Sequence, residues 1–328
     1  MKLNRAHQTL YAWVIGMVVI LPAFDAQADT QRINLANGDV YEGEVIEGAR
    51  TGRGVYVWAD GHRYEGDFVN NRMQGEGSYY WPDGRTYTGS FVADRREGNG
   101  VLRSPNGDVY SGEFAENQMH GQGVFVWANK DRYEGTFLDG KRTGEGEFQW
   151  FSGERYKGAF VDGIQQGEGV FEWLDGRSFS GTFESGAKSG YGVFGWPNGN
   201  RYTGEFAADE RSGLGIFYWR DGTVYQGHFA SNRMEGYGVK RQPDGTKELQ
   251  HWHEGALVLN RLLEGQQRCT LVIEQRDWMF EGTECVNGLA HGQGLAASLD
   301  GELVIVDGQF VLGKLVRGEV QVLAPEES

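Results

Sequence analysis

Residues 64–86 read YEGDFVNNRMQGEGSYYWPDGRT, and this stretch decides the fold because its landmark residues return every 23 residues. A Tyr opens the stretch, Gly and Phe follow it, and a Gly-x-Gly pair, a Trp and an Asp-Gly dipeptide complete it. The landmarks of this copy are Tyr64, Gly66, Phe68, Gly75, Gly77, Trp81 and Gly84. Offset 0 denotes the opening aromatic residue. A fixed period of this length is typical of a repeat array.

The unit occurs nine times between residues 41 and 247. Its opening residues are Tyr41, Tyr64, Tyr87, Tyr110, Tyr133, Tyr156, Phe179, Tyr202 and Tyr225. Every copy has Gly at offsets 2, 11 and 13, and seven copies have Trp at offset 17. The third copy departs most, because Leu102 and Ser104 replace the aromatic residue at offset 15 and the Trp. Most of the 52 glycines thus occupy fixed positions of the repeat, which excludes a flexible Gly-rich linker.

The parity of the landmarks predicts β-strands. Offsets 0, 2 and 4 share one parity, as do offsets 11, 13, 15 and 17, so extended strands put all these residues on one face. Gly on that face leaves room for a neighbouring ring to lie against the backbone. The opposite face carries mostly Glu, Ser, Thr, Gln and Arg. This alternation is typical of an antiparallel sheet with one face in water.

The residues between the strands predict tight turns. Offset 7 is Gly, Asn or Asp in all nine copies, the residues that best tolerate positive φ. Offsets 19 and 20 are mostly Asp-Gly or Asn-Gly, a strong hairpin signal, with Asn129-Lys130 as the exception. A lone hairpin is marginal in water, so stability must come from stacked neighbours. We therefore expect an all-β, elongated, curved single antiparallel sheet of about eighteen repeat strands, its aromatic side concave or covered.

Both ends of the array carry degenerate copies. In residues 29–40, Ile33, Leu35 and Gly38 take the places of the offset-15 aromatic residue, the Trp and the turn, which predicts a capping strand. A tenth copy opens after residue 247, with Trp252 at offset 4 and Gly255 at offset 7. Its offset-2 Gly is replaced by Gln.

Two weaker copies follow, at Phe280-Glu-Gly282 and at Val306-Asp-Gly308-Gln-Phe310. We therefore read 248–328 as degenerate repeats that close the sheet at its C-terminal end.

The pattern resembles the MORN (membrane occupation and recognition nexus) repeat. The resemblance rests on Tyr-x-Gly-x-Phe, Gly-x-Gly-x-aromatic-x-Trp and Asp-Gly at a 23-residue period over residues 41–247. It implies a non-enzymatic scaffold that binds protein partners or associates with a membrane surface. Relatives that are enzymes carry their chemistry in another domain. We therefore expect no catalytic residue, cofactor or metal site in this chain.

The first 28 residues read as an export signal. Lys2 and Arg5 precede an apolar run over 10–21, and Ala26-Gln-Ala28 fits a signal-peptidase site. The expected location is the periplasm or the exterior. Retention of the segment as an inner-membrane anchor is the lesser alternative.

The two cysteines, Cys269 and Cys285, are expected to form a structural disulfide, because an exported chain meets an oxidising compartment. Spacing alone does not prove the pairing, since a disulfide also needs compatible backbone geometry.

Charge narrows the range of partners. The chain has 31 Lys and Arg against 46 Asp and Glu, a formal net charge of -15, which argues against nucleic acid. We expect a scaffold of the cell envelope with protein partners, contact with an envelope membrane, or self-association through an exposed strand edge. The alternative is a periplasmic glycan- or peptidoglycan-binding module that uses the aromatic face.

Three local features have plain structural interpretations. Gly190 to Gly195 matches the G-x-G-x-x-G string, but two of its glycines belong to the repeat and no helix is expected after it. His251 and His253 are expected to be solvated strand residues. The basic residues at offset 9 are expected to lie in loops along a solvated edge, with Met73, Met119 and Met234 between them. They are Arg50, Arg96, Arg142, Lys188 and Arg211.

Overall fold

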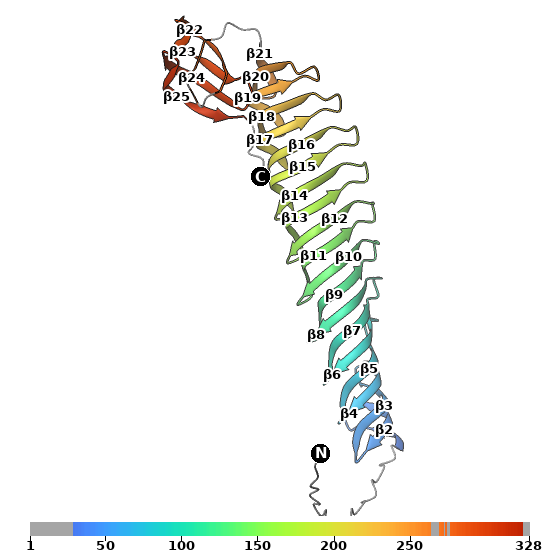
Figure 1. The fold of residues 1–328 in the computed structure, drawn as a ribbon. Coiled ribbons are helices and arrows are strands. Elements are labelled where there is room, and N and C mark those ends of the chain that lie inside the picture. The colour runs from blue at the N-terminus through green and yellow to red at the C-terminus, as the bar shows by residue number, and fades with distance from the viewer. Residues whose placement is uncertain (1–28, 264–268, 272, 274–275, 324–328) are drawn as a thin grey trace, which may run out of the picture.

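The computed structural model describes residues 29–263, 269–271, 273 and 276–323, and in these residues the chain is built from strands and turns. An elongated stack of hairpins runs from β1 to β21, and a smaller sheet sits at the C-terminal end (Figure 1). Within the described residues, no helix is long and apolar enough to cross a membrane. The predicted export signal lies outside the described residues. The all-β class and the hairpin array are confirmed.

The long sheet has 21 antiparallel strands. Its first strand is β1 (Asp29–Asn34), and its last two are β20 (Lys247–His253) and β21 (Ala256–Leu262). The strands between them form the nine repeats, two strands each: β2 (Val40–Ile46), β3 (Ala49–Val57), β4 (Arg63–Val69), β5 (Arg72–Tyr80), β6 (Thr86–Val92), β7 (Arg95–Arg103), β8 (Val109–Ala115), β9 (Gln118–Val126), β10 (Arg132–Leu138), β11 (Lys141–Gln149), β12 (Arg155–Val161), β13 (Ile164–Glu172), β14 (Ser178–Glu184), β15 (Ala187–Gly195), β16 (Arg201–Ala207), β17 (Glu210–Tyr218), β18 (Val224–Ala230) and β19 (Arg233–Arg241).

The register puts the landmark residues on one face, as their parity predicts. In the fifth repeat, Tyr133 pairs with Phe148 and Gly135 pairs with Gly146. Phe148 in turn pairs with Tyr156 of the next repeat, so the rings of successive hairpins lie side by side. The opening Tyr side chain is at most 1% exposed wherever it occurs in the array. The single sheet thus buries a core on its aromatic face.

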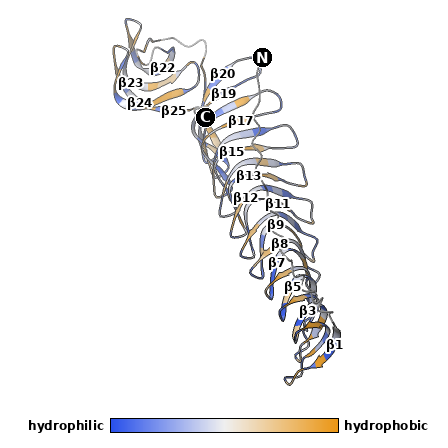
Figure 2. Ribbon diagram, turned by 60° about the horizontal axis from the view of Figure 1, so that its bottom comes forward, coloured by the Kyte–Doolittle hydropathy of each residue, from blue (hydrophilic) through white to orange (hydrophobic). Residues whose placement is uncertain are grey.

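The two glycines of the Gly-x-Gly pair have different structural roles. The first has positive φ in all nine repeats, for example 58° at Gly144, and lies at a β-bulge opposite Thr136. A bulge with a left-handed Gly bends the strand and increases its twist. The second lies under the ring at offset 0. Figure 2 shows the resulting bent hairpins, stacked one behind another.

The hairpin turns match the prediction at offset 7 and extend it. Offset 7 has positive φ in every repeat, and so does offset 6, for example 49° at Asp139 and 80° at Gly140. Two successive left-handed residues make the hairpin turn whose twist matches that of the strands. Offset 20 is also left-handed throughout, including Lys130 at φ 75°.

The rings of offsets 0 and 4 join the repeats. Tyr133 contacts Phe137 of its own repeat and Phe160 of the next, with both ring centroids 5.2 Å away and both pairs nearly perpendicular. Edge-to-face pairs of this kind add about 0.5–1.5 kcal/mol beyond area burial. The same contacts recur along the array, so each repeat is stabilised mainly by its neighbours.

The C-terminal copies form a sheet of their own. β22 (Trp278–Val286), β23 (Leu289–Ser298), β24 (Leu303–Val311) and β25 (Lys314–Val322) make a four-stranded antiparallel sheet. The expectation that these copies close the long sheet is wrong, because the repeat spacing is lost between β21 and β22 and the described strands of these copies pair with one another rather than with the long sheet.

The small sheet covers the end of the array. Val239 and Leu249 of the long sheet share an apolar cluster with Met279 and Val304 of the small one. The ammonium group of Lys247 donates to the carbonyl oxygens of Leu299 and Asp300, at 3.0 and 3.1 Å. The small sheet therefore acts as a cap, as atypical terminal repeats do.

Candidate partner-binding groove

The aromatic face carries a continuous ladder of rings from β9 to β17. Neighbouring centroids are 4.4–4.6 Å apart within a repeat and 5.2–5.4 Å apart between repeats, with interplanar angles of 37–54°. Each ring packs against the next at a tilt, so neighbouring rings cover part of its faces. The rings are Phe125, Trp127, Phe148, Trp150, Phe171, Trp173, Phe194, Trp196, Phe217 and Trp219.

A shorter ladder covers the first two repeats, from Tyr56 to Trp81. The interruption falls at the third repeat, where Leu102 and Ser104 stand in place of rings. The described aromatic face is therefore a long, nearly continuous row of rings.

Basic side chains insert between these rings. The guanidinium carbon of Arg142 lies 5.0 Å from the ring centroid of Phe148 and 5.5 Å from those of Trp127 and Tyr133. Arg96 and Arg211 occupy equivalent slots. Stacking of a cation on rings at these distances is favourable.

The prediction that the offset-9 residues lie in loops on a solvated edge is wrong. Arg142 is the second residue of β11 and is half-buried, because the turn before this strand is only two residues long. Arg50, Arg96, Lys188 and Arg211 likewise lie in strands and are half-buried.

The same arginines link successive repeats. One terminal nitrogen of Arg142 donates to the carbonyl oxygen of Gly163 at 2.8 Å, and the backbone N–H of Gly163 donates to the Arg142 carbonyl at 2.8 Å. Arg50 makes the equivalent pair of bonds with Asn71, both at 2.9 Å. Each arginine is therefore held at a fixed place along the face.

These arginines have no described carboxylate within ion-pair distance, although hydrogen bonds from Tyr56 and Ala59 and the nearby charge of Arg50 lower the pKa of Asp39. Within the described residues, the guanidinium groups of Arg50, Arg96, Arg142 and Arg211 form no ion pair with a carboxylate, whereas Lys188 pairs with Asp209 at 2.6 Å. Burial lowers the pKa of Arg96, Arg142 and Arg211, although a guanidinium stays charged at neutral pH. Unpaired positive charge is thus held among aromatic rings.

Three hollows follow one another along this face, at the second to fourth, third to sixth, and sixth to ninth repeats. Each combines a Trp, a second ring, an offset-4 Phe, a basic residue and at least one Asp. The aspartates are Asp94 in the first hollow, Asp108 and Asp131 in the second, and Asp209 in the third. We call the surface formed by the ring ladder, the inserted basic residues and the offset-7 loops the aromatic groove. The three hollows are lined in part by Tyr79, Trp81, Phe91 and Arg96, by Phe148, Trp150, Phe160 and Arg142, and by Phe194, Trp196, Phe206 and Arg211.

The groove offers hydrogen-bond donors. None of the seven offset-17 indole N–H groups has a partner within the described residues, and the one buried polar side-chain atom left without a partner there is the hydroxyl of Tyr225. The indole nitrogens are therefore open to solvent. Together with the unused guanidinium N–H groups, they would suit a ligand rich in acceptors and negative charge.

The other sequence candidates lie elsewhere. Gly190 and Gly195 both belong to strand β15, so the G-x-G-x-x-G string has no helix after it. His251 stacks on Tyr237, with centroids 4.2 Å apart, and His253 lies 3.2 Å from a carboxylate oxygen of Glu235. Among the described residues, no group of three or more His, Cys, Asp or Glu side chains is arranged to hold a metal ion.

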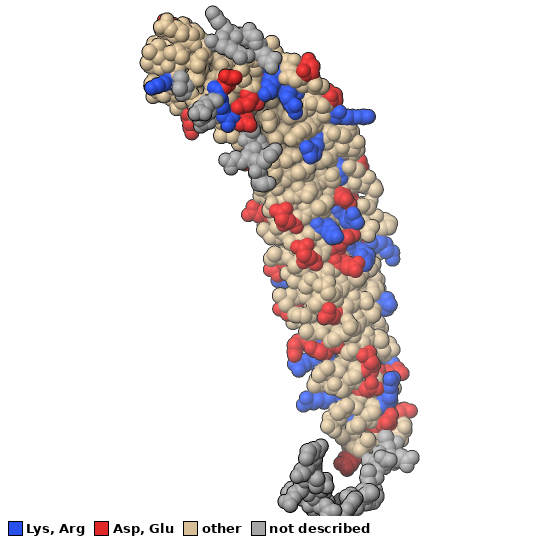
Figure 3. Space-filling view, in the orientation of Figure 1, with Lys and Arg blue, Asp and Glu red and all other residues tan. Residues whose placement is uncertain are grey.

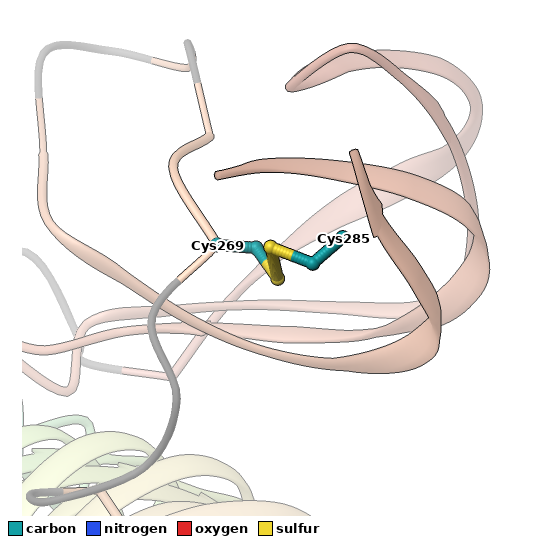
Figure 4. The surroundings of a disulfide bond; sticks show 2 residues. All are labelled: Cys269 and Cys285. Carbon is teal, nitrogen blue, oxygen red and sulfur yellow. A yellow bond between two sulfur atoms is a disulfide. The ribbon is translucent and has the colours of Figure 1, made fainter. Parts of the chain in front are cut away.

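The two cysteines are joined by a disulfide bond, with their Cα atoms 5.7 Å apart (Figure 4). The bond ties the segment before β22 to the far end of that strand. Cys269 is buried against Leu271 and Phe280 in the core of the small sheet. The disulfide therefore belongs to the cap and lies away from the aromatic groove.

The repeats match a known family. A family model described as the MORN repeat matches nine segments of the chain, which together span more than half of it. The chain belongs to the MORN repeat family. The matched segments are residues 41–63, 64–84, 87–109, 110–132, 133–155, 156–176, 179–201, 202–224 and 225–247.

Comparisons with whole proteins add little. A search of curated proteins returned no match. Among solved structures, the chain is similar to a mutant of the TCP10 domain of Danio rerio CPAP, with 14% identity over 70% of this chain and 98% of that one and a TM-score of 0.31. It is also similar to the CPAP G-box domain, with 13% identity over 69% and 100% and a TM-score of 0.27. TM-scores this low carry no argument.

MORN repeats mediate contacts with proteins or membranes, so the aromatic groove is the candidate contact surface of this array. On the face visible in Figure 3, Lys and Arg are interspersed with Asp and Glu, and no large patch of one sign is present. Alternating charges keep a surface solvated without selecting a partner. The groove combines half-buried rings, cations that form no ion pair, and the aspartates that line its hollows.

Proposed function

We propose that this MORN-repeat protein is a non-enzymatic scaffold of the cell envelope that holds a protein partner along its aromatic groove. The observation that carries the proposal is the fixed row of unpaired guanidinium groups inserted between half-buried rings. An Arg desolvated among aromatic side chains is typical of the anchor residues of protein interfaces. Because the array holds these groups in place before binding, little ordering is needed when a partner docks.

The location in the envelope is supported by the N-terminal signal and by the disulfide. A basic start, an apolar run and a small-x-small site are the parts of a secretory signal. Disulfides persist in oxidising compartments and are rare in the cytosol. Both features favour the periplasm or the exterior as the place where the groove meets its partner.

The glycan-binding alternative is less favoured by the geometry of the rings. Binding of a sugar by stacking needs an open ring face, as in other aromatic platforms. Here Trp150 packs between Phe148 and Phe171, with centroids 4.5 and 5.2 Å away, so neighbouring rings cover part of its faces. What the groove presents is partly covered rings and donors.

Fractionation combined with chemical cross-linking in intact cells tests this proposal. The protein is expected in the periplasmic or secreted fraction, with a mature N-terminus at Asp29 and in covalent adducts with a second protein. A cytoplasmic protein that retains residues 1–28 would contradict the envelope location. A strict monomer without adducts would contradict the scaffold function.

A further inference from the structure

The usual strand spacing of a β-sheet gives the groove an expected period that suits one backbone conformation. Two strands about 4.8 Å apart make each repeat about 9.6 Å long. A polyproline II helix has three residues per turn and rises about 3.1 Å per residue, so it presents the same face about every 9.3 Å. The mismatch is about 0.3 Å per repeat. Every third residue of such a helix thus stays in step with the ring ladder over several repeats.

Other regular conformations fit the groove less well. A β-strand returns to the same face about every 6.8 Å, which is out of step with the repeats. Seven residues of an α-helix span about 10.5 Å, so its contacts drift by about 1 Å per repeat. An α-helix also uses its carbonyl groups internally, which leaves the indole N–H groups without acceptors.

The chemistry of the lining points the same way. A polyproline II helix has no internal hydrogen bonds, so its carbonyl groups are free to accept from the seven indole N–H groups. Its proline rings fit between ridges of aromatic side chains, the way proline-rich segments dock elsewhere. The tilted rings of the ladder, such as Phe148 and Trp150 at 51°, form ridges of this kind.

The arginines without an ion pair favour a ligand that carries negative charge. Arg50, Arg96 and Arg142 occupy alternate repeats, with Met73 and Met119 between them. Two repeats span about 19 Å and six residues of a polyproline II helix about 18.6 Å. A carboxylate at every sixth position of a bound segment would therefore face successive guanidinium groups.

We propose that the aromatic groove binds an acidic, proline-rich segment of a partner protein in the polyproline II conformation. The inference rests on the proposed function and names the kind of partner that the groove takes. The segment lies along the hairpin stack and crosses the strands. Its carbonyl groups accept from the indole nitrogens, and its carboxylates pair with the inserted arginines.

Fluorescence anisotropy with synthetic peptides and the purified full chain tests the inference. The main probe is three copies of Pro-Pro-Pro-Pro-Pro-Glu. A second probe has Lys in place of each Glu, and a third keeps the Glu residues and replaces each Pro by Gly or Ser. The main probe should bind at least about tenfold more tightly than either of the others.

Matched variants locate the binding. Arg96→Gln with Arg142→Gln removes two unpaired charges from the groove and should weaken binding of the main probe about tenfold. Arg95→Gln with Arg132→Gln removes two arginines that already pair with Glu116 and Glu134, and should leave binding unchanged. An unaltered circular dichroism spectrum checks that each variant is folded.

Several results would overturn the inference. These are equal binding of all three peptides, no binding of the main probe, or binding that the groove variant leaves unchanged. Binding of chito-oligosaccharide or of phosphatidylglycerol vesicles in the groove, without binding of the main probe, would assign the groove to another ligand class. If a partner protein cross-links to the groove and the proline peptides do not bind, the inference fails and the proposed function stands.

Discussion

The ring of Tyr133 lies directly on the backbone of Gly146, on the strand paired with its own. A Cβ atom added at Gly146 would meet the Tyr133 hydroxyl oxygen at 2.5 Å and a ring carbon at 2.6 Å. The hydroxyl donates to the carbonyl oxygen of Thr136 at 3.1 Å, which fixes the ring over the glycine. The same arrangement recurs throughout the array and explains why the offset-13 residue is Gly in every repeat.

Gly146→Ala should therefore destabilise the protein by about 3 kcal/mol, because the fully buried ring of Tyr133 has no space to move into. Denaturation by guanidinium, followed by Trp fluorescence, measures the loss.

Gly195→Ala is the matched control. A Cβ atom there meets only the hydroxyl oxygen of Ser178, at 3.1 Å, and its φ is not in the left-handed region. This variant should change the free energy of unfolding by less than about 1 kcal/mol. Equal losses in the two variants would show that the ring contact does not determine the glycine.

Lys130→Gly should stabilise the fourth repeat by about 1 kcal/mol. Lys130 is the one residue at offset 20 that is not Gly, and its φ of 75° is a conformation that L side chains rarely adopt. Lys130→Ala keeps the Cβ atom and should give no gain. The midpoints of thermal unfolding of the wild-type protein and the two variants test this prediction, and equal midpoints would refute it.

The buried tyrosines should make the fold sensitive to alkali. Burial raises the pKa of Tyr87, Tyr133 and Tyr156 to about 12, whereas an unfolded Tyr titrates near about 10. Because the folded pKa is the higher one, this contribution to stability is fully present below about pH 10 and is lost as the pH rises to about 12.

A pH titration measures this loss directly. Tyrosinate absorbance and the circular dichroism signal of the sheet should change together in one step between about pH 10 and 12. Ionisation of most tyrosines near about pH 10 with the sheet intact would contradict their burial.

Removal of the disulfide should loosen the cap and spare the repeats. The bond closes a loop with a sequence separation of 16, so Cys269→Ser with Cys285→Ser should cost the small sheet about 3 kcal/mol. In a repeat array each unit contacts only its neighbours, so the unfolding of the distant first repeats should be unchanged. Limited proteolysis, with the reduced wild-type protein for comparison, distinguishes local loosening from global loss.

The repeat architecture was predictable because the fixed 23-residue period shows which residues occupy equivalent positions in successive hairpins. Tyr133, Gly135 and Phe137 share a parity with Gly146 and Phe148, and the structure pairs them accordingly. The turn at Gly140 was predictable for the same reason. Left-handed φ at offset 6 was not, since residues such as Glu47 and Ala93 give no such signal and adopt this conformation because the turn requires it.

The groove itself was harder to predict. The parity of offset 9 predicts that Arg142 lies on the aromatic face, but its charge favoured a position in solvent. The structure shows that the turn before Arg142 has only two residues and that its guanidinium group is held between aromatic rings. The separate cap was also missed. Phe280 and Gly282 repeat the motif and so suggested a further repeat of the long sheet. The packing of the small sheet on the long one, through residues such as Val239 and Met279, cannot be predicted from the period of the sequence.

Site-specific photo-cross-linking tests the central claim most directly. A photoreactive phenylalanine analogue replaces either Trp150, in the aromatic groove, or its neighbour Gln149, which is exposed on the opposite face of β11. Irradiation of intact cells should give a discrete adduct with one partner protein from position 150 and none from position 149. Adducts of equal yield from both positions, or adducts from position 149 alone, would contradict the claim that the groove is the partner-binding surface.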